Sequence, residues 1–419
     1  MGLISARCYL ICTVLVGLFA VIALVIGIAG PIYLNSTLKS GINDEILNTS
    51  KDSPAYKRWQ DNTEDDAAAI LMKFWIWNIT NPDEVEKGAN PVVQEVGPYS
   101  YREYNIYLDV SWSADQTKMN WTKWQYFVYS PEDSFEGADP YNDIFTTVNV
   151  PLMSVIGALT FNQSYETLWW KTLAYDFLAS YTNEELFFQI NANDLLFGYN
   201  DSMLALAASL SPEVPAEFFL QLNMTSPEDA MKYSGVNVVD TGKTDITNIG
   251  SFIQWHNSTS VGCWGNVEAN TVIGNDATQF RPGIKKGDLP KVWVDQLFRM
   301  VEIQGTGDAE VKGIKVIEFT IPAEGYMNAT EYPANAAYWQ FWQPGVGNLT
   351  ACEHGAPVFM SKPHFLDAPY FLSQVSGMNP NREKHDTFVY VEPTIGECFR
   401  AYKRLQLNIR LQPDPLLYL

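Results

Sequence analysis

Ten asparagines of the chain stand in the Asn-x-Ser/Thr pattern that accepts N-linked sugars. They are Asn35, Asn48, Asn78, Asn120, Asn162, Asn200, Asn223, Asn257, Asn328 and Asn348. Chance would supply roughly four such triplets in a chain of this asparagine and Ser/Thr content. The excess predicts that the part of the chain carrying them is lumenal or extracellular. Asn78 lies inside an aromatic run, where burial would block a glycan most readily.

The residue types that catalyse hydrolysis or bind metals do not form a recognisable set. The histidines show neither HExxH spacing nor a helical i, i+4 pair; they are His256, His354, His364 and His385. The sequence also lacks a GxSxG elbow and a GxxxxGK[ST] loop. Acidic pairs such as Asp65-Asp66 are interpreted as solvated faces rather than as a glycosidase dyad, whose carboxylates lie about 5–10 Å apart. We therefore predict no catalytic residue, no metal site and no cofactor.

The five cysteines fall into two groups. Cys8 and Cys12 lie in or beside an apolar stretch, whereas Cys263, Cys352 and Cys398 belong to the long remainder of the chain. In an oxidising compartment, three cysteines predict one disulfide and one remaining thiol, or an intermolecular bond, with the pairing left open. Cys8 is a candidate for reversible palmitoylation; the alternative is a small apolar residue in a helix.

The apolar stretch over residues 8–34 has no charged side chain. It exceeds the roughly 20 residues that a helix needs to cross a hydrocarbon core of about 30 Å. We predict a transmembrane signal-anchor, with residues 1–7 cytoplasmic and residues 35–419 forming the ectodomain. A cleaved signal peptide is the alternative, although its apolar region is usually about 7–15 residues long. Basic residues flank the stretch on both sides, so the orientation rests on the glycosylation triplets, all of which lie beyond it.

Composition limits the partners of the ectodomain. A net charge of −21 argues against nucleic acid, because it repels phosphate backbones. Hydrophobic residues make up 47% and aromatic residues 14% of the chain, which indicates a globular body and favours strands.

Apolar patterning predicts strands through most of the ectodomain. The run 70–82 is typical of a buried strand that ends at Asn81-Pro82, and 92–104 is predicted as a second strand broken at Gly97-Pro98. A third covers 121–130. Later, 315–322 places alternate apolar residues on one face, and 405–412 alternates Leu or Ile with polar residues, which predicts a strand with one wet face.

A helical region interrupts these strands after Pro151. Helices are predicted over 165–181, 183–196 and 202–210, and a shorter one over 55–60. On the first, Trp169, Leu173 and Phe177 recur at i, i+4 and i+8 and form an apolar stripe. This stripe is interpreted either as packing against neighbouring helices or as an exposed surface that carries function.

Short strings along the chain resemble the class B scavenger receptor family, which includes platelet glycoprotein IV, the high-density-lipoprotein receptor and a lysosomal integral membrane protein. The strings are Phe74-Trp75-Ile76-Trp77, Asn81-Pro82, Glu84-Val85, Gly97-Pro98-Tyr99, Tyr101-Arg102, Gly198-Tyr199, Asp240-Thr241-Gly242, Gly274 with Asp276, Gly355 with Pro357-Val358, Pro363-His364-Phe365-Leu366, Asn379-Pro380-Asn381, Glu392-Pro393 with Gly396, and Lys403-Arg404-Leu405-Gln406. Together they stand in family order and cover nearly the whole chain.

The resemblance implies a fold that is mainly β with α. It implies a membrane-anchored ectodomain formed by an irregular antiparallel β-barrel, with an apical helical bundle over about 151–235, the crown, and an internal apolar tunnel. The family's second transmembrane helix is absent from this sequence, so we expect the sequence to be a fragment. The resemblance also implies a plasma membrane or a lysosomal or endosomal membrane as the location.

The resemblance bears on the cysteines and on the charge of the crown. Cys352 matches a family half-cystine, but the segment around Gln296, where its usual partner lies, has no cysteine; Cys263 is then the favoured partner. Between residues 151 and 233 the chain has two lysines and ten acidic residues. Such a crown should not attract anionic modified lipoproteins as the basic crown of some relatives does.

The leading functional hypothesis is a non-enzymatic receptor and carrier in the bilayer whose ligands are fatty acid, sterol, phospholipid or lipoprotein. Its expected docking surface on the crown comprises Leu168, Trp169, Trp170, Leu173 and Phe177. An alternative is a lysosomal trafficking receptor that binds a lumenal hydrolase through the crown. A more remote alternative is a type II Golgi glycosyltransferase, although the sequence lacks the Asp-x-Asp pair that such enzymes often use.

Overall fold

The computed structural model describes residues 2–60, 70–160, 185–210, 217–338 and 343–411. The chain forms two compact units, Met1–Arg58 and Trp59–Leu419. The first unit contains helix α1 (Gly2–Ile46), which includes the predicted anchor, and the start of α2 (Pro54–Trp59), where a short helix was expected. No helix in the described ranges is both long enough and apolar enough to cross a membrane. The anchor over 8–34 therefore stays a prediction.

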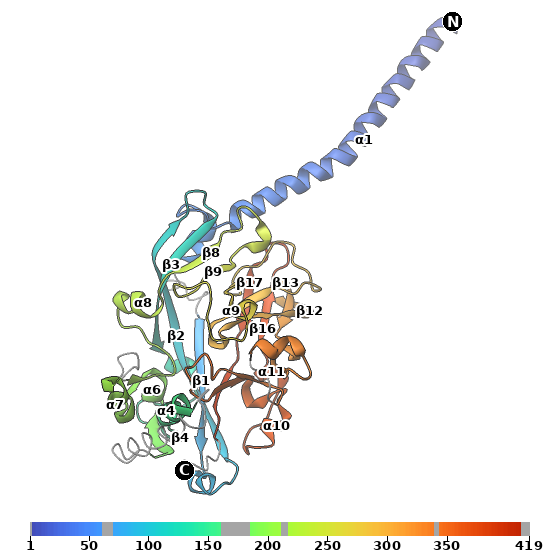
Figure 1. Ribbon diagram of the computed structural model, residues 1–419. Helices are drawn as coiled ribbons and strands as arrows, with labels where there is room; N and C mark the ends of the chain where they lie inside the picture. Colours follow the sequence, from blue (N-terminus) through green and yellow to red (C-terminus); the bar gives the residue numbers. More distant parts are fainter. Residues whose placement is uncertain (1, 61–69, 161–184, 211–216, 339–342, 412–419) are drawn as a thin grey trace. The chain divides into compact units, whose positions relative to one another are not determined.

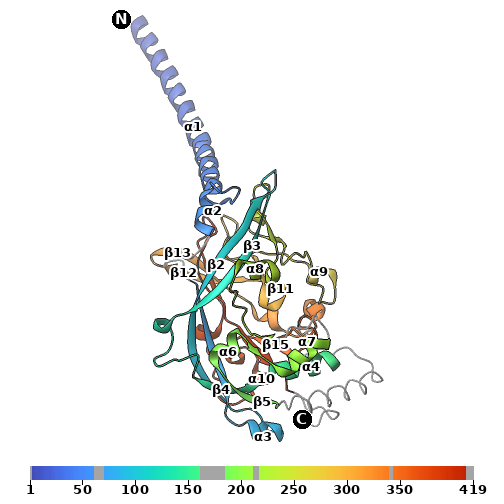
Figure 2. The same cartoon turned by 90° about the vertical axis from the view of Figure 1, so that its left-hand side faces the viewer.

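A curled antiparallel sheet forms one side of the second unit (Figure 1). Its described strands, in spatial order, are β1 (Ile70–Ile79), β2 (Val93–Trp112), β3 (Lys118–Tyr129), β8 (Asn237–Asp240) and β9 (Phe252–Gln254). The long strands β2 and β3 remain side by side when the view is turned by 90° (Figure 2). Successive antiparallel neighbours of this kind are typical of a sheet that bends toward a barrel.

The predicted break of the second strand at Gly97-Pro98 is wrong, because β2 continues through both residues. A register shift in the pairing with β1 between Phe74 and Ile76 accommodates the pair instead. Gly97 has a φ of +150°, and a Cβ atom there would lie 2.7 Å from the Phe74 carbonyl oxygen. Glycine is therefore required where the two strands approach, and the strand continues through the proline.

Shorter antiparallel sheets form the other side of the second unit. The described strands of one are β12 (Gln304–Val311), β13 (Ile314–Thr320), β16 (Phe388–Val391) and β17 (Cys398–Tyr402). Those of another are β14 (Val346–Asn348), β15 (Val358–Ser361) and β18 (Gln406–Ile409). A hairpin is formed by β10 (Lys291–Val294) and β11 (Arg299–Glu302). These strands enclose the largest buried apolar cluster, the main core, which comprises Trp264, Ala269, Phe280, Ile284, Val292, Val294, Leu297, Val301, Ile303, Ile317, Phe319, Ile321, Tyr326, Leu349, Ala356, Val358, Met360, Val389 and Val391.

Two predicted strands of this side have different outcomes. Ile317, Phe319 and Ile321 are buried as their alternation predicts, so that strand is confirmed. The terminal strand exists as β18, but its predicted faces are wrong in part, because Gln406 is buried and Leu407 is 40% exposed. Gln406 is drawn inward by hydrogen bonds that a pattern of apolar residues does not reveal.

The region after Pro151 is a mixture of helices and short strands. Its described helices are α4 (Val150–Thr160), α6 (Ala192–Phe197), α7 (Ser202–Leu210) and α8 (Pro227–Tyr233). Its described strands pair as β4 (Ile144–Val148) with β5 (Phe187–Asn191), and as β6 (Tyr199–Asn200) with β7 (Glu217–Phe218). The expected helix 202–210 is confirmed as α7. The expected helix 183–196 is wrong over β5, which is a strand. In β5, Ile190 and Phe187 are buried in two separate apolar clusters. The expected helix 165–181 lies outside the described residues.

Short helices and 3-10 turns connect the described strands. They are α3 (Pro82–Glu86), α9 (Val267–Asn270), α10 (Pro369–Leu372), α11 (Arg382–His385), η2 (Pro131–Asp133), η3 (Ile246–Asn248), η4 (Asp295–Leu297), η5 (Ala323–Tyr326), η6 (Pro333–Tyr338) and η7 (Pro363–Phe365).

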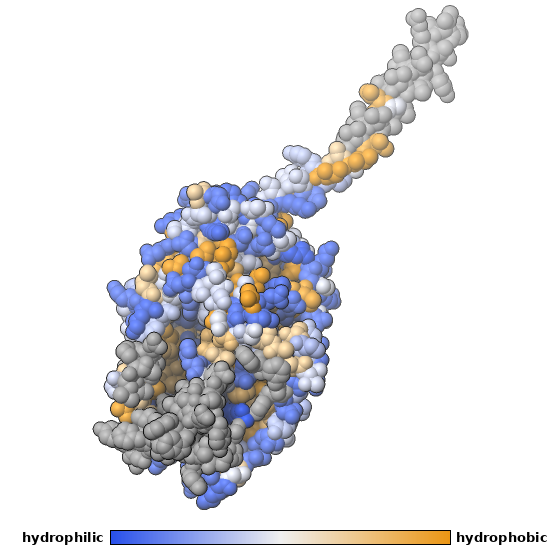
Figure 3. Space-filling view, in the orientation of Figure 1, coloured by the Kyte–Doolittle hydropathy of each residue, from blue (hydrophilic) through white to orange (hydrophobic). Residues whose placement is uncertain are grey.

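On the face of the second unit shown in Figure 3, hydrophilic residues alternate with smaller apolar areas.

Candidate functional site

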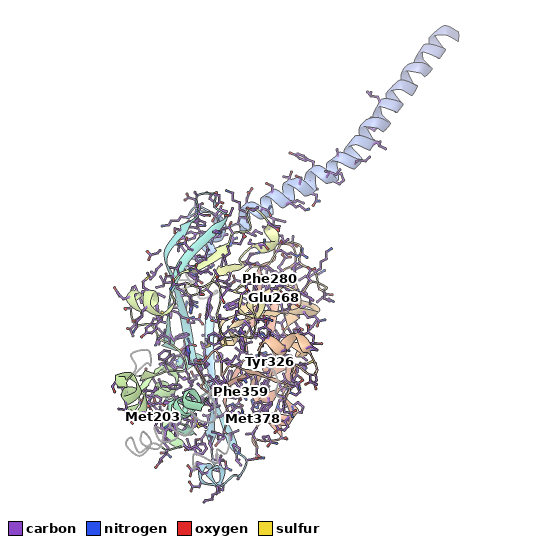
Figure 4. The ribbon with its side chains drawn as sticks, in the orientation of Figure 1. Met203, Glu268, Phe280, Tyr326, Phe359 and Met378 are labelled. Atoms are coloured by element: carbon purple, nitrogen blue, oxygen red, sulfur yellow. A yellow bond between two sulfur atoms is a disulfide. The ribbon has the colours of Figure 1, made fainter. Side chains whose placement is uncertain are left out.

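A cavity of about 230 Å³ lies between the turn η5, the start of β14 and the segment from β15 to α10. Its lining is Ala323, Tyr326, Met327, Glu331, Pro344, Gly345, Lys362, Leu366, Asp367 and Pro369. Figure 4 shows Tyr326 within the side of the unit that also contains Phe280 and Phe359. Most of the lining is apolar, as in sites that accept small apolar ligands.

One wall of the cavity depends on a glycine. Gly345 has a φ of +100°, and a Cβ atom there would lie 2.3 Å from Ala368 Cβ. The N–H of Gly345 donates a hydrogen bond of 2.7 Å to the Tyr326 carbonyl oxygen. The chain before β14 is thereby held against both η5 and the segment that precedes α10.

A buried lysine on the cavity wall is neutralised by two carboxylates. The side chain of Lys362 is only 4% exposed, and its Nζ lies 3.0 Å from Asp367 Oδ2 and 2.9 Å from Asp386 Oδ1. The guanidinium of Arg382 pairs with the same two aspartates. Burial acts to raise the pKa of Asp367, but hydrogen bonds and charge interactions with Lys362 and Arg382 outweigh burial and lower that pKa below its usual value. We call Lys362, Asp367, Arg382 and Asp386 the paired cluster.

Two histidines extend the paired cluster. The Nδ1 atom of His364 accepts the Asn379 backbone N–H at 2.9 Å, and its Nε2 lies 2.9 Å from Glu95 Oε1. His364 stacks on His385 with the ring centroids 4.0 Å apart. His364 is therefore built in as the tautomer that carries its proton on Nε2 and donates it to Glu95.

The second histidine is held in its neutral form. His385 Nδ1 accepts the Asn381 backbone N–H at 2.9 Å. Burial is the main cause that lowers the pKa of His385, to about 4, and electrostatic interactions with His364, Arg404 and Lys384 act in the same direction. Several strings that carried the family resemblance, including Pro363-His364-Phe365-Leu366 and Asn379-Pro380-Asn381, thus meet in one network. Sequence reasoning missed it, because Glu95 and His364 stand 269 positions apart.

The crown residues expected to form a docking surface, Leu168, Trp169, Trp170, Leu173 and Phe177, lie outside the described residues, and so does the triplet at Asn162. The side chain of Cys8 is also not described. These assignments stay predictions.

None of the described triplet asparagines is buried, and Asn35, Asn200 and Asn257 are exposed. Asn78 and Asn223 use their side-chain carbonyls to accept backbone N–H groups of Thr146 and Phe127, at 2.9 and 3.0 Å. These two sites are therefore engaged in the fold, and glycan occupancy stays a prediction at every triplet.

Cys263 and Cys352 form a disulfide, which is the pair that the resemblance favoured. The bond joins positions separated by 89 residues and packs beside the main core. Cys398 is a free thiol, and burial raises its pKa to about 11, so the thiol is protonated and unreactive at neutral pH.

The described part of the second unit thus combines antiparallel sheets, a mostly apolar cavity and a long-range polar network. Comparison with known proteins defines its class: a model described as the CD36 family matches residues 15–418. The chain belongs to the CD36 family, and the resemblance to class B scavenger receptors is confirmed.

The relatives of the chain include a lysosome membrane protein and a scavenger receptor. The chain is 30% identical to lysosome membrane protein 2 of Mus musculus, over 81% of the chain and 68% of that protein. It is 23% identical to scavenger receptor class B member 1 of Cricetulus griseus, over 94% of the chain and 75% of that protein. Sensory neuron membrane protein 2 of Manduca sexta is 26% identical over 83% of the chain and 71% of that protein. These names support the expected membrane localisation and a non-enzymatic class.

Proposed function

We propose that the chain is a scavenger-receptor-like membrane protein whose ectodomain binds lipid or lipoprotein and passes fatty acid or sterol to the bilayer. The observation that carries the proposal is the cavity between η5 and α10, because its lining is mostly apolar and the close approach at Gly345 fixes one of its walls. The transfer of an apolar molecule from water to such a site lowers the free energy. Membership of a family that contains named scavenger receptors supports this ligand class.

The proposal includes the anchor over 8–34, a crown over about 151–235 and a tunnel from the crown to the bilayer. Hydrophobic cargo needs an enclosed route, and the curled sheet opposite the shorter sheets is an architecture that could enclose one. The membrane in question is the plasma membrane or a lysosomal or endosomal membrane, as the names of both groups of relatives suggest.

A second candidate function is a lysosomal receptor that binds a lumenal protein through the crown. The specific observation in its favour is the 30% identity with lysosome membrane protein 2. The glycosyltransferase alternative loses support, since the named relatives are receptors and membrane proteins.

Photo-crosslinking in intact cells tests the lipid proposal. Full-length chain is exposed to photoactivatable fatty acid and sterol analogues, irradiated, purified and mapped by mass spectrometry. We expect label on cavity residues such as Met327 and Leu366, competed by excess natural lipid. Leu366→Trp should fill the cavity and abolish labelling there, whereas Leu289→Trp at a 53% exposed position is the matched control. A chain without competable label would count against lipid carriage, and recovery of a lumenal hydrolase instead would favour the second function.

A further inference from the structure

Tyr141 is the most exposed tyrosine in the described part of the second unit. It is 61% exposed, whereas Tyr99 and Tyr101, two tyrosines of β2, are 0% and 3% exposed. Within the described ranges its hydroxyl forms no hydrogen bond, and its backbone N–H is the group that does. The phenolic oxygen is therefore open to solvent and to an enzyme.

The fold fixes this exposure from both sides. Pro140, just before Tyr141, is buried, and its carbonyl oxygen accepts the Asn193 N–H at 2.8 Å. Asp143, two positions after Tyr141, accepts a hydrogen bond of 2.7 Å from the Tyr99 hydroxyl. The turn is thereby anchored before and after Tyr141, and the ring between the two anchors is left in solvent.

The loop around Tyr141 is acidic, and no base offsets its charge. Residues 132–143 include five carboxylates, whereas no lysine, arginine or histidine occurs from 124 to 170. None of these carboxylates forms an ion pair with a residue that the structure describes. They are Glu132, Asp133, Glu136, Asp139 and Asp143. Their charges add up to a negative field around one exposed phenol.

Hydrogen bonds favour the ionised form of Asp139 in this loop. Its Oδ2 accepts a hydrogen bond of 2.8 Å from Asn142 Nδ2, and its Oδ1 accepts the Tyr141 backbone N–H at 3.1 Å. Both hydrogen bonds lower the pKa of Asp139 below its usual value. The negative charge beside Tyr141 therefore persists in mildly acidic compartments of the secretory pathway.

The chemistry that suits such a phenol in an exported protein is sulfuryl transfer. The donor of an activated sulfuryl group is a nucleotide phosphosulfate, which is a polyanion, so the enzyme site that binds it must be positively charged. Electrostatic complementarity attracts a segment with carboxylates on both sides of its tyrosine to that site. Residues 130–143 also contain no cysteine and no glycosylation triplet, so neither a disulfide nor a glycan of the loop itself obstructs access.

We propose that Tyr141 is a site of O-sulfation by a nucleotide phosphosulfate in the secretory pathway. The phenolic oxygen attacks the sulfur atom, so a new O–S bond forms while the bond from sulfur to the phosphate oxygen breaks. The nucleotide leaves with the electron pair of that bond, the phenolic proton passes to a base of the sulfotransferase, and nothing is oxidised or reduced. The product carries a negative charge at a position where the phenol, with a pKa of about 10, is neutral.

This inference requires that the loop is exported, and it does not depend on which ligand the ectodomain binds. To test it, the full chain is expressed with radioactive sulfate in animal cells that coexpress a tyrosylprotein sulfotransferase. The purified chain is treated with peptide-N-glycosidase, because sulfated glycans would also carry the label. We expect sulfate that remains after this treatment and is recovered as tyrosine sulfate after alkaline hydrolysis. Tyr141→Phe should reduce that label to background.

Two matched controls separate the site from general effects. Tyr370→Phe changes a tyrosine that is 48% exposed but has one carboxylate within five positions on either side, and it should keep the label of the wild type. The double variant Glu132→Gln and Glu136→Gln removes two exposed charges and should lower the label about 3- to 10-fold. Glu302→Gln with Glu310→Gln, at exposed positions of β11 and β12, should leave it unchanged. Equal thermal unfolding midpoints show that every variant is folded.

Four results would overturn the inference. A folded wild type without sulfate after removal of its N-glycans would show that Tyr141 is not a substrate. Sulfate that survives in Tyr141→Phe would place the modification elsewhere. Radioactive phosphate instead of sulfate at Tyr141 would assign the site to a kinase. An undiminished label in the Glu132 and Glu136 double variant would contradict recognition through the acidic loop.

Discussion

Lys362 and Arg299 are two buried cations of the second unit, and their surroundings differ. Lys362 is 3% exposed and has two carboxylates within 3.0 Å. Arg299 is 8% exposed and contacts the face of Tyr338, and no carboxylate among the described residues forms an ion pair with it. A cation that is fully paired within its own chain contributes to structure, whereas a cation without an internal anion can recognise one from outside.

The same contrast extends to the groups around each cation. In the paired cluster, Asp386 also accepts the Thr387 backbone N–H at 3.0 Å, so its charge is shared among several donors. On the main-core side, Trp293 Nε1 and Gln296 Oε1 are buried without partners in the described part of the chain, as is Tyr326 Oη. The comparison predicts that mutations in the paired cluster lower stability more than removal of an unpartnered buried group on the main-core side does.

The largest effect is expected from breaking the paired cluster with Asp386→Asn. This change leaves the buried Lys362 with one carboxylate in place of two and removes an anion from Arg382, which should lower the free energy of unfolding by about 3–5 kcal/mol. Urea unfolding of the full chain measures it. The matched control is Asp308→Asn, whose ion pair with Lys286 is 83% exposed on the aspartate side and should matter by less than about 1 kcal/mol. Equal losses in the two variants would contradict the distinction.

The next effect concerns the disulfide beside the main core. Replacing Cys263 and Cys352 together with serine should lower the free energy of unfolding by about 2–4 kcal/mol, since the bond closes a loop of 89 residues. Thermal unfolding with and without reductant provides the measurement. Cys398→Ser is the control. Because Cys398 is a free thiol, this variant should respond to reductant as the wild type does. A double variant as stable as the wild type would show that packing alone holds the main core around Arg299.

Local patterns predicted the elements that position this site better than they predicted the site. The alternation of Ile317, Phe319 and Ile321 identified β13, and the apolar run before Pro212 identified α7, because in both cases burial follows chain periodicity. The same reasoning predicted the wrong face for Gln406 in β18. Its side-chain oxygen accepts hydrogen bonds from Trp77 Nε1 and the His364 N–H, which come from distant segments.

Arg299 shows what could have been found from the sequence. It stands in the alternation Arg299, Val301, Ile303, whose apolar members are 4% and 2% exposed. An arginine in phase with buried residues signals a functional or paired charge. Whether a described carboxylate lies next to Arg299 depends, by contrast, on which segments the fold brings together, and no local pattern carries that information.

A smaller effect is expected from pH, through His385 at the edge of the paired cluster. Its folded pKa of about 4 lies below the ordinary value of about 6.5, so the unfolded chain takes up a proton first as the pH falls. The stabilisation is complete above pH ~6.5 and is lost as the pH falls toward ~4. Allowing for partial exposure, the loss should be about 1–2 kcal/mol.

His385→Asn keeps an acceptor for the Asn381 N–H but cannot titrate, so it should flatten the pH dependence of urea unfolding between pH ~7 and ~4.5. The control is His354→Asn at an exposed position, which should leave the profile of the wild type. An unchanged profile in His385→Asn would assign the acid sensitivity to other groups.

The smallest effect on stability is expected where the comparison is sharpest, at a single hydroxyl. Tyr99 Oη donates a hydrogen bond of 2.7 Å to Asp143, whereas Tyr326 Oη has no partner among the described residues, and both rings are at most 5% exposed. Tyr99→Phe should therefore lower the free energy of unfolding by about 1–2 kcal/mol, because it removes a made bond and leaves a carboxylate short of a donor. Tyr326→Phe removes a buried hydroxyl that forms no hydrogen bond with the described residues. Its effect on the free energy of unfolding should therefore stay within about 0.5 kcal/mol or be slightly stabilising. Paired urea titrations of the ligand-free chain measure both values. Should Tyr326→Phe cost as much as Tyr99→Phe, the Tyr326 hydroxyl must be satisfied by water or another group in solution.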